Sequence, residues 1–345
     1  MNNILYVGPL HYSGTCFQRM RSIQKIGCVV YPINTAIPSV STKEKKISYR
    51  IIKKIFGPSD FGNYLNNKII SSLGKFNDID ALWLDKGLKV YPSTLKFIKK
   101  NYPLVYIIGY SPDDMLNKRN QSRYFLEGLK YYDFFFTTKS YGVKELKYLG
   151  AHKVFFISNG FSPEVHFPIE VSNEDRVKYG GDVGFIGNYE RDRALKLLYL
   201  ANNGIKVRIF GSNWHKLKIS NKNIIIENKF LEGLEYTKSI CSFKINLAFL
   251  SKQNRDLQTT RSIEIPACNG FMLAERTTEH IDLFQEKKEA EFFSSNREMI
   301  NKIRYYLQHE KERLKIAENG YKRCILSGYS NNERMKTIIG IINNY

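Results

Sequence analysis

The chain has 345 residues, with 53 Lys and Arg against 33 Asp and Glu, so its formal net charge is +20. This length predicts about two domains. A hydrophobic content of 43% with 14% aromatic residues excludes a disordered chain.

No apolar run reaches the length of about 18 residues that a transmembrane helix needs, and the start lacks the pattern of a signal peptide. The five cysteines form no C-x-x-C pair, which favours reduced thiols in a cytoplasmic protein over a disulfide frame or a zinc site. The positive charge favours an anionic partner: nucleic acid, anionic lipid or a phosphorylated substrate.

The first half alternates short apolar runs with segments of helix length. Strands are predicted at 4–8, 28–33, 81–85, 104–110, 133–138 and 153–158. Helices are predicted at 16–26, 92–101, 121–130 and 141–149. This alternation is typical of the α/β class with a mainly parallel, doubly wound sheet.

Residues 41–76 interrupt this pattern and predict a basic helical insertion. The window 41–54 carries six Lys or Arg and one Glu, and its isoleucines share one helical face. A helix of this kind over 41–56 either lies on an anionic membrane surface or packs on its own domain, and the sequence leaves both open.

The second half repeats the α/β plan. Strands are predicted at 182–187, 206–211, 223–227, 244–250 and 270–275, with a helix at 193–203 and a helical region at 297–326. A polar stretch at 163–181 forms the join. We expect an N-terminal domain over 1–168, a C-terminal domain over 169–328, and a last helix in 329–345 that crosses back to the first domain.

A strand, a turn and a helix follow one another at 182–200. Gly187 ends the strand and Asn188 begins the turn, so the free N–H groups of the next helix could face a phosphate. Arg191 and Arg193 in the same turn could add charge-assisted bonds to a diphosphate. A purely structural turn is the alternative, because the segment lacks G-x-G-x-x-G and the P-loop pattern.

A second candidate lies at 259–276. Glu264 opens a predicted short helix, and its two oxygens suit the diol of a ribose, whereas Arg261 suits a phosphate. The alternative is that Glu264 only stabilises the helix dipole.

Several segments of the chain resemble those of one protein family. The segment RSIEIPACNGFMLAER resembles the signature of the CgeB-like glycosyltransferases, a group with the GT-B fold. Further segments match the same family in order, at 83–95, 110–115, 131–139, 149–168, 183–193, 210–215 and 303–325. The resemblance covers most of the chain after residue 80, together with the first strand and turn.

The resemblance implies two Rossmann-like domains that face each other across a cleft. The C-terminal domain would bind a nucleotide-diphosphate sugar and the N-terminal domain its acceptor. Many related enzymes carry an E-x7-E pair whose second Glu binds the ribose. Glu264 occupies that second position. Asp256 stands in place of the first Glu, whose role in the family is usually near the donor sugar, and so departs from the pattern.

The same resemblance places Arg261, Gly187 and Asn188 by the diphosphate. It places the loop with Gly211, Ser212 and Trp214 nearest the base. Trp214 could stack on that base, or its ring could simply be packed, which is the more frequent case for a Trp.

Catalysis is expected to use basic side chains and helix N-termini instead of a metal, since negative charge develops on the leaving phosphate. Asp113 and Asp114 follow the strand at 104–110 and could supply a base for an inverting reaction. The alternative is that this carboxylate pair caps a helix or binds positive side chains. Most E-x7-E relatives retain configuration, and we expect the same here. His11, on the first turn, is a further candidate to contact acceptor or donor. No cofactor and no metal are expected.

The leading hypothesis is a glycosyltransferase that acts on a cell-surface polysaccharide or a glycolipid precursor such as lipopolysaccharide. Its partners would be the nucleotide sugar, a glycan or lipid-linked acceptor, and an anionic membrane surface at the inner face of the plasma membrane, reached through 41–56. Three alternatives stay open: a basic nucleic-acid-binding protein, a two-domain nucleotide-sugar epimerase, and a non-catalytic relative. Nucleic acid is not expected as a partner, because no helix-turn-helix, zinc finger or RNP-like strand is present.

Overall fold

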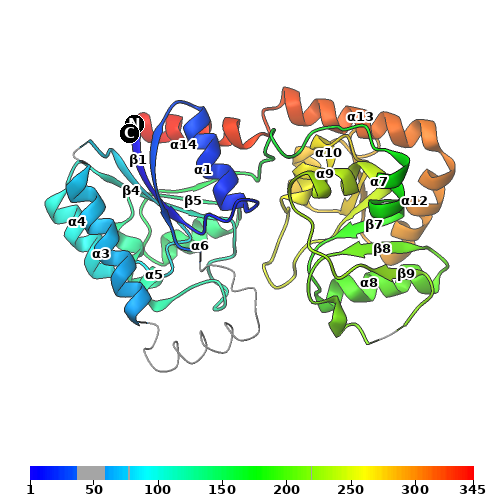
Figure 1. Cartoon of the computed structure of the whole chain (residues 1–345), viewed down its shortest axis with the longest axis horizontal. Coiled ribbons are helices and arrows are strands. Elements are labelled where there is room, and N and C mark those ends of the chain that lie inside the picture. Colours follow the sequence, from blue (N-terminus) through cyan, green and yellow to red (C-terminus); the bar gives the residue numbers. More distant parts are fainter. Residues whose placement is uncertain (37–58, 77, 219) are drawn as a thin grey trace. The chain divides into compact units, whose positions relative to one another are not determined.

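The computed structural model describes residues 1–36, 59–76, 78–218 and 220–345 (Figure 1). The basic helix predicted over 41–56 therefore lies outside the described residues, as does most of the insertion to which it belongs. The chain divides into two compact units. Unit 1 comprises Met1–Ser158 and Met335–Tyr345, and unit 2 comprises Asn159–Arg334.

Unit 1 is built on a six-stranded sheet in the order β2-β1-β3-β4-β5-β6, in which all pairs are parallel. Its strands are β1 (Asn3–Gly8), β2 (Val29–Asn34), β3 (Ala81–Asp85), β4 (Tyr106–Ser111), β5 (Phe134–Thr137) and β6 (Val154–Phe156). All six lie where the sequence predicts strands.

Alternation along β1 builds a core on each face of this sheet. Leu5 and Val7 join one cluster of buried side chains, and Ile4 and Tyr6 join the other, because successive strand residues point to opposite faces. The helices of unit 1 are α1 (Thr15–Lys25), α3 (Ser59–Lys75), α4 (Pro92–Asn101), α5 (Arg123–Gly128), η1 (Leu129–Tyr131), α6 (Gly142–Tyr148) and the greater part of α14 (Asn331–Asn343).

The last helix returns to unit 1. Met335, Ile338 and Ile342 of α14 are buried in the same cluster as Ile4 and Tyr6, and their spacing places them on one helical face. The chain termini accordingly lie together (Figure 1), and the N-terminal ammonium donates a hydrogen bond to Asn343 Oδ1 at 3.3 Å.

Unit 2 has a second parallel six-stranded sheet, in the order β12-β11-β10-β7-β8-β9. Its strands are β7 (Gly181–Ile186), β8 (Val207–Phe210), β9 (Ile224–Ile226), β10 (Phe243–Ala248), β11 (Met272–Glu275) and β12 (Glu291–Phe293). The sequence analysis missed β12, since three residues carry too little of the apolar pattern that marks a strand.

Two hydrophobic clusters again cover the two faces of this sheet. The helices of unit 2 are α7 (Asn173–Tyr179), α8 (Arg191–Asn202), η2 (Trp214–Lys216), α9 (Gly233–Ser242), α10 (Arg261–Ala267), α11 (Thr278–Leu283), α12 (Asn296–Gln308) and α13 (Glu310–Leu326). The predicted fold class, two doubly wound α/β domains, is confirmed.

The boundary between the units falls after Ser158, ten residues before the end of the N-terminal domain expected at 168. The chain returns to unit 1 at Met335, within the segment 329–345 for which we expected a crossing helix. In the parts of the chain that the structure describes, no helix combines the length and the apolar character that crossing a membrane requires.

Candidate functional site

Two loops are fastened together at the carboxyl edge of the unit 2 sheet, where β7 and β8 end. The Gly187 amide donates to the Phe210 carbonyl at 2.9 Å, and the Tyr189 amide donates to the Ser212 carbonyl at 3.0 Å. The Ser212 amide in turn donates to Asn188 Oδ1 at 3.1 Å. The predicted residues of these two loops are therefore brought together.

Gly211 is required by this close approach. Its φ is +141°, and a Cβ atom there would lie 2.0 Å from the Gly187 carbonyl oxygen. A side chain at this position would therefore push the two loops apart.

The structure corrects the expectation for Trp214. Its side chain is only 1% exposed and belongs to the core of unit 2. Its indole N–H donates to the Gly187 carbonyl at 2.8 Å, and the edges or faces of Phe185 and Tyr189 contact the ring. A ring enclosed in this way holds the loop in place and has no free face for stacking on a base.

Arg193 lies in the first turn of α8 and is 4% exposed. Its Nη1 pairs with Glu190 Oε1 at 2.8 Å and donates to the Asn188 carbonyl at 3.2 Å. Burial and, after it, the positive charge of Arg261 lower the pKa of Arg193 to about 10, against the opposing effect of nearby carboxylates. Arg191, the first residue of the same helix, is exposed.

Arg261 begins α10 and carries an unused donor. Its Nε atom is buried without a hydrogen-bond partner among the described residues. Because Arg193 and Arg261 repel each other and one of them has an unsatisfied N–H, this edge of the sheet would be stabilised by an anion with several oxygen acceptors.

Besides Glu190, two carboxylates near this arginine pair, Asp256 and Glu275, also have other partners. Asp256 accepts hydrogen bonds from the Ser251 amide at 3.2 Å and from Asn254 Nδ2 at 2.9 Å, so it shapes its own loop. Glu275 lies 3.4 Å from Lys252 and 3.7 Å from Lys196. The role of Asp256 near a donor sugar stays a prediction.

Glu264, on α10, is 5% exposed and is held from two sides. Tyr236 of α9 donates its hydroxyl proton to Oε2 at 2.6 Å, and His166 Nε2 lies 3.7 Å from Oε1. A carboxylate has about four lone-pair directions, so acceptor capacity remains for a diol beside these two partners.

His166 is neutral in this arrangement. Its Nδ1 accepts a hydrogen bond from the Ser162 amide at 3.0 Å, which places the ring proton on Nε2, toward Glu264. Burial lowers the pKa of His166, although the Glu264 carboxylate opposes this effect. The sequence analysis gave no site role to Tyr236 or His166, because their contacts with Glu264 join segments that are distant in the chain.

A second buried histidine fixes the start of α10. The Thr259 amide donates to Ser262 Oγ at 3.0 Å, and Ser262 Oγ lies 2.7 Å from His280 Nε2. His280 Nδ1 lies 2.6 Å from the Glu275 carbonyl and must donate to it, so Nε2 accepts the serine proton. Burial lowers the pKa of His280, and the neutral ring therefore positions the helix that carries Arg261 and Glu264.

The predicted residues of unit 1 lie at the carboxyl edge of its own sheet. Asp113 follows β4 and forms an ion pair with Lys86. Asp114 is buried and accepts a hydrogen bond from the Leu116 amide at 3.0 Å, which stabilises the turn. His11 is exposed between β1 and α1, and its carbonyl accepts from the Gly14 amide at 2.9 Å.

A buried ion pair beneath this edge escaped the sequence analysis. Arg19 of α1 donates to Asp85 at the end of β3 through Nε at 2.9 Å and through Nη2 at 2.7 Å. The Tyr6 hydroxyl also donates to Asp85, at 2.9 Å, and the guanidinium lies 4.4 Å from the centre of the Tyr110 ring.

Among the described residues, no group of three or more His, Cys, Asp or Glu side chains is arranged to hold a metal ion.

Comparison with known families gives a match in the second half of the chain. Residues 191–340, from α8 into α14, match a family model described as glycosyl transferase-like. The matched segment contains the arginine pair, Asp256 and Glu264. No curated protein sequence matches the chain significantly.

Solved structures resemble the whole chain. Sucrose-phosphate synthase from Thermosynechococcus elongatus has a TM-score of 0.68 at 10% identity, with all of both chains covered. Anabaena HepE in complex with UDP-glucose has a TM-score of 0.67 at 11% identity, again with complete coverage. A glycosyltransferase from Rickettsia africae has a TM-score of 0.62 at 13% identity and covers 99% of this chain and 97% of its own.

At these identities the structural likeness establishes the fold alone, and the expected GT-B architecture is confirmed. The narrower resemblance to the CgeB-like group stays a prediction. Residues 191–340 thus match a glycosyl transferase-like family model, and the whole chain has the GT-B architecture.

Proposed function

We propose that the protein transfers a sugar from a nucleotide-diphosphate donor, bound by unit 2, to a glycan or lipid-linked acceptor that is a precursor of a cell-surface polysaccharide or glycolipid. The observation that carries the proposal is the arginine pair at the carboxyl edge of the unit 2 sheet. Burial and the positive charge of Arg261 lower the pKa of Arg193. The Nε–H group of Arg261 is itself buried without a hydrogen-bond partner among the described residues.

The donor's parts correspond to the residues around this edge. The diphosphate would accept hydrogen bonds from Arg261 and lie near Arg193, with Gly187 and Asn188 in the adjoining loop. The ribose diol would donate to Glu264, which Tyr236 and His166 hold in place. HepE, whose fold this chain shares, has been solved with UDP and with UDP-glucose, which supports a nucleotide sugar as the ligand.

The chemistry follows from the charge that develops on the leaving group. When the bond between the sugar and the diphosphate breaks, negative charge accumulates on the terminal phosphate oxygen. Fixed guanidinium groups in a partly buried site stabilise that charge without reorganising. We propose that Arg193 and Arg261 do this without a metal ion, and that the reaction retains the anomeric configuration.

The acceptor would bind to unit 1. Asp113 and His11 lie at the carboxyl edge of its parallel sheet, the edge at which ligands bind in open α/β folds. Asp113 is only partly buried, and Lys86 orients it, whereas Asp114 is committed to the turn. Asp113 is therefore the better candidate to contact the acceptor hydroxyl.

The test is a panel of nucleotide sugars, read by thermal shift and by slow hydrolysis of the donor, with and without a chelator. We expect one nucleotide to raise the melting temperature and Glu264→Ala or Arg261→Ala to abolish the shift. Exposed Arg297, which lies outside this group of residues, supplies the control Arg297→Ala. If no nucleotide shifts the melting temperature, the proposal is wrong.

An epimerase is the second candidate, because a UDP-N-acetylglucosamine 2-epimerase from Listeria monocytogenes shares the fold with a TM-score of 0.56 at 9% identity. Analysis of the products separates the two activities. A transferase consumes the donor and releases a nucleoside diphosphate together with a glycosylated acceptor, whereas this epimerase activity would invert one sugar carbon. Release of the nucleoside diphosphate that depends on an added acceptor supports the transferase. NMR of the product's anomeric proton then tests retention.

The membrane role of 41–56 and a cytoplasmic location at the inner face of the plasma membrane belong to the same proposal. Neutralising Lys45, Lys46, Lys53 and Lys54 should weaken binding to vesicles that contain anionic lipid at low salt. Unchanged vesicle binding would contradict this part of the proposal and leave the donor site unaffected.

A further inference from the structure

Unit 2 has a hollow of about 390 Å³ at the amino-terminal edge of its sheet, where β7, β8 and β10 begin. This is the edge opposite to the one that carries Gly187 and Arg193. Four cationic side chains line it, against a single carboxylate, Asp182. The cations are Arg176, Lys206, Arg208 and Lys244. We call this feature the amino-edge hollow.

Two of the four cations have partners. Arg208 pairs with Glu227 at 2.7 Å and donates to the carbonyls of Val177 and Gly180 at 2.7 and 3.0 Å, so it holds the end of α7 in place. Lys244 pairs with Asp182 at 2.7 Å, but these side chains are 53% and 49% exposed. An ion pair this exposed to water contributes little to stability, so Lys244 can turn to another anion.

The other two cations, Arg176 and Lys206, are exposed. Over the described ranges of the chain, neither side chain forms an ion pair or a hydrogen bond. The lining beside them includes Gly180 and Gly181, which contribute no side chains. Small ligands can therefore approach the cations closely.

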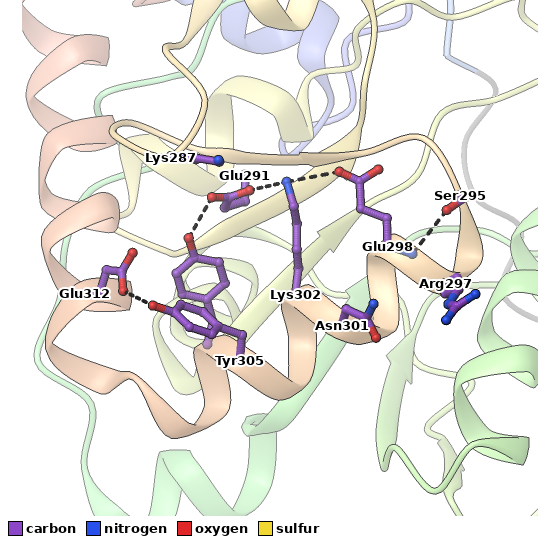
Figure 2. A pocket seen from close by; sticks show the side chains of 10 residues that line it. Lys287, Glu291, Ser295, Arg297, Glu298, Asn301, Lys302, Tyr305 and Glu312 are labelled. Carbon is purple, nitrogen blue, oxygen red and sulfur yellow. Dashed lines mark hydrogen bonds and ion pairs between the residues drawn. The ribbon is translucent and has the colours of Figure 1, made fainter.

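A larger hollow in the same unit shows that this imbalance is local. Figure 2 shows the hollow of about 660 Å³ beside α12, whose lining includes the cationic residues Lys287, Arg297 and Lys302 and the carboxylates of Glu291, Glu298 and Glu312. Here Lys302 Nζ bonds to Glu291 at 2.5 Å and lies 3.3 Å from Glu298. An excess of cationic side chains in a hollow is therefore not a general result of the net charge of +20.

We propose that the amino-edge hollow binds a ligand that bears a phosphate group. A phosphate has three strong acceptor oxygens and up to two negative charges. The planar guanidinium of Arg176 can bind two of the oxygens, and the ammonium groups of Lys206 and Lys244 can bind the remainder. This site is additional to the proposed function, because it lies on the opposite edge of the sheet from the residues assigned to the donor.

The probe is inorganic pyrophosphate, titrated by calorimetry into the full chain and into the variant Arg261→Ala, which removes the proposed donor contact. In both backgrounds, Arg176→Ala/Lys206→Ala should weaken binding at the amino-edge hollow at least about tenfold, for the loss of two charge-assisted contacts. The matched control is Lys287→Ala/Arg297→Ala, which removes the same charge from the balanced hollow and should leave the affinity unchanged. All four positions line the surface, and melting temperatures verify that the variants fold.

Vesicles of phosphatidylcholine, with or without phosphatidylglycerol, distinguish the source of the phosphate. If Arg176→Ala/Lys206→Ala reduces binding to the anionic vesicles, the ligand is a lipid headgroup; if it affects pyrophosphate alone, the ligand is a free phosphate compound. The inference is overturned if this double variant binds pyrophosphate as tightly as the Lys287→Ala/Arg297→Ala control, or if the parent chain does not bind it. Failure of the donor proposal is separate, since it appears as nucleotide binding that survives Arg261→Ala.

Discussion

Each unit buries one arginine near the carboxyl edge of a parallel sheet, and the two arginines are in opposite electrostatic situations. Burial acts to lower the pKa of Arg19, but Asp85 and its neighbours outweigh it and raise the pKa well above its usual value. Burial also lowers the pKa of Arg193, and there Arg261 adds to the effect, so that the pKa falls to about 10. Arg19 is neutralised within the fold, whereas Arg193 lacks full neutralisation.

This difference indicates that Arg19 stabilises the fold, and it supports the proposal that Arg193 contributes to binding an anion. A buried cation with a matched carboxylate needs nothing further, but a cation crowded by a second arginine is most stable when an anion is bound. Among the described residues, this comparison supports the carboxyl edge of unit 2 as the place where the proposed diphosphate binds. The predictions below test the comparison, beginning with the largest expected effect.

Arg19→Met should destabilise the protein by about 3–5 kcal/mol, because it leaves Asp85 charged and buried without its partner. Urea denaturation of the full chain measures the loss. The double variant Arg19→Met/Asp85→Leu should recover most of it, since both charges are then absent. A single variant as stable as the parent would show that the pair is not buried as described.

Arg193→Met should lower activity without lowering stability, in contrast to Arg19→Met. Its folded pKa lies below the ordinary value, so the charge is unfavourable in the fold, and an apolar side chain of similar length should preserve or raise the melting temperature. We expect kcat/KM for donor hydrolysis to fall about 100-fold, as for other lost donors to a developing negative charge. A stable variant with full activity would contradict the binding role of Arg193.

Tyr236→Phe tests how Glu264 is positioned. The change removes one hydroxyl that donates to Oε2, so the carboxylate loses a restraint but keeps its charge. We expect KM for the donor to rise about tenfold, the equivalent of one hydrogen bond to a charged group, with little change in kcat. Tyr305→Phe, at an exposed tyrosine of α12 that also donates to a glutamate, is the matched control.

The smallest effect concerns acid stability. His166 and His280 have folded pKa values below the ordinary one, with burial as the main cause. The stabilisation that these neutral histidines add to the free energy of unfolding is complete above the unfolded pKa of about 6.5. It is lost as the pH falls below that value, because the unfolded chain then takes up protons that the folded chain does not. Unfolding free energies between pH 7 and 5 should decline less steeply in His166→Gln than in the parent, and an equal slope would contradict the assignment.

The sequence predicts the fold well because parallel strands buried on both faces form short apolar runs that stand out between helices. The sequence analysis also names Gly187 and Asn188 from the strand–turn–helix pattern, and Gly211 and Ser212 from the family resemblance. That the two loops contact each other is shown by the structure, in which the carboxyl ends of the neighbouring parallel strands β7 and β8 lie at one edge.

The sequence does not reveal contacts made by single side chains across long separations. In the sequence, Trp214 belongs to a predicted loop, where its ring could stack on a base. In the structure its indole N–H donates to a carbonyl 27 positions earlier in the chain, and its ring is buried in the core. Arg19 and Asp85 are 66 positions apart. The sequence gives only a weak indication that these two residues are buried. Asp85 ends a strand that is otherwise apolar, and Arg19 lies on the same helical face as Cys16 and Ile23.

The return of α14 to unit 1 has a consequence for biosynthesis. On the ribosome, all of unit 2 emerges before Met335, Ile338 and Ile342 can cover the apolar face formed by Ile4 and Tyr6. Unit 1 is therefore translated first but completed last. One face of its sheet stays uncovered until some 180 further residues have been synthesised. A nascent chain stalled after unit 2 should consequently present that uncovered face to chaperones, whereas unit 2 on the same chain should already resist protease.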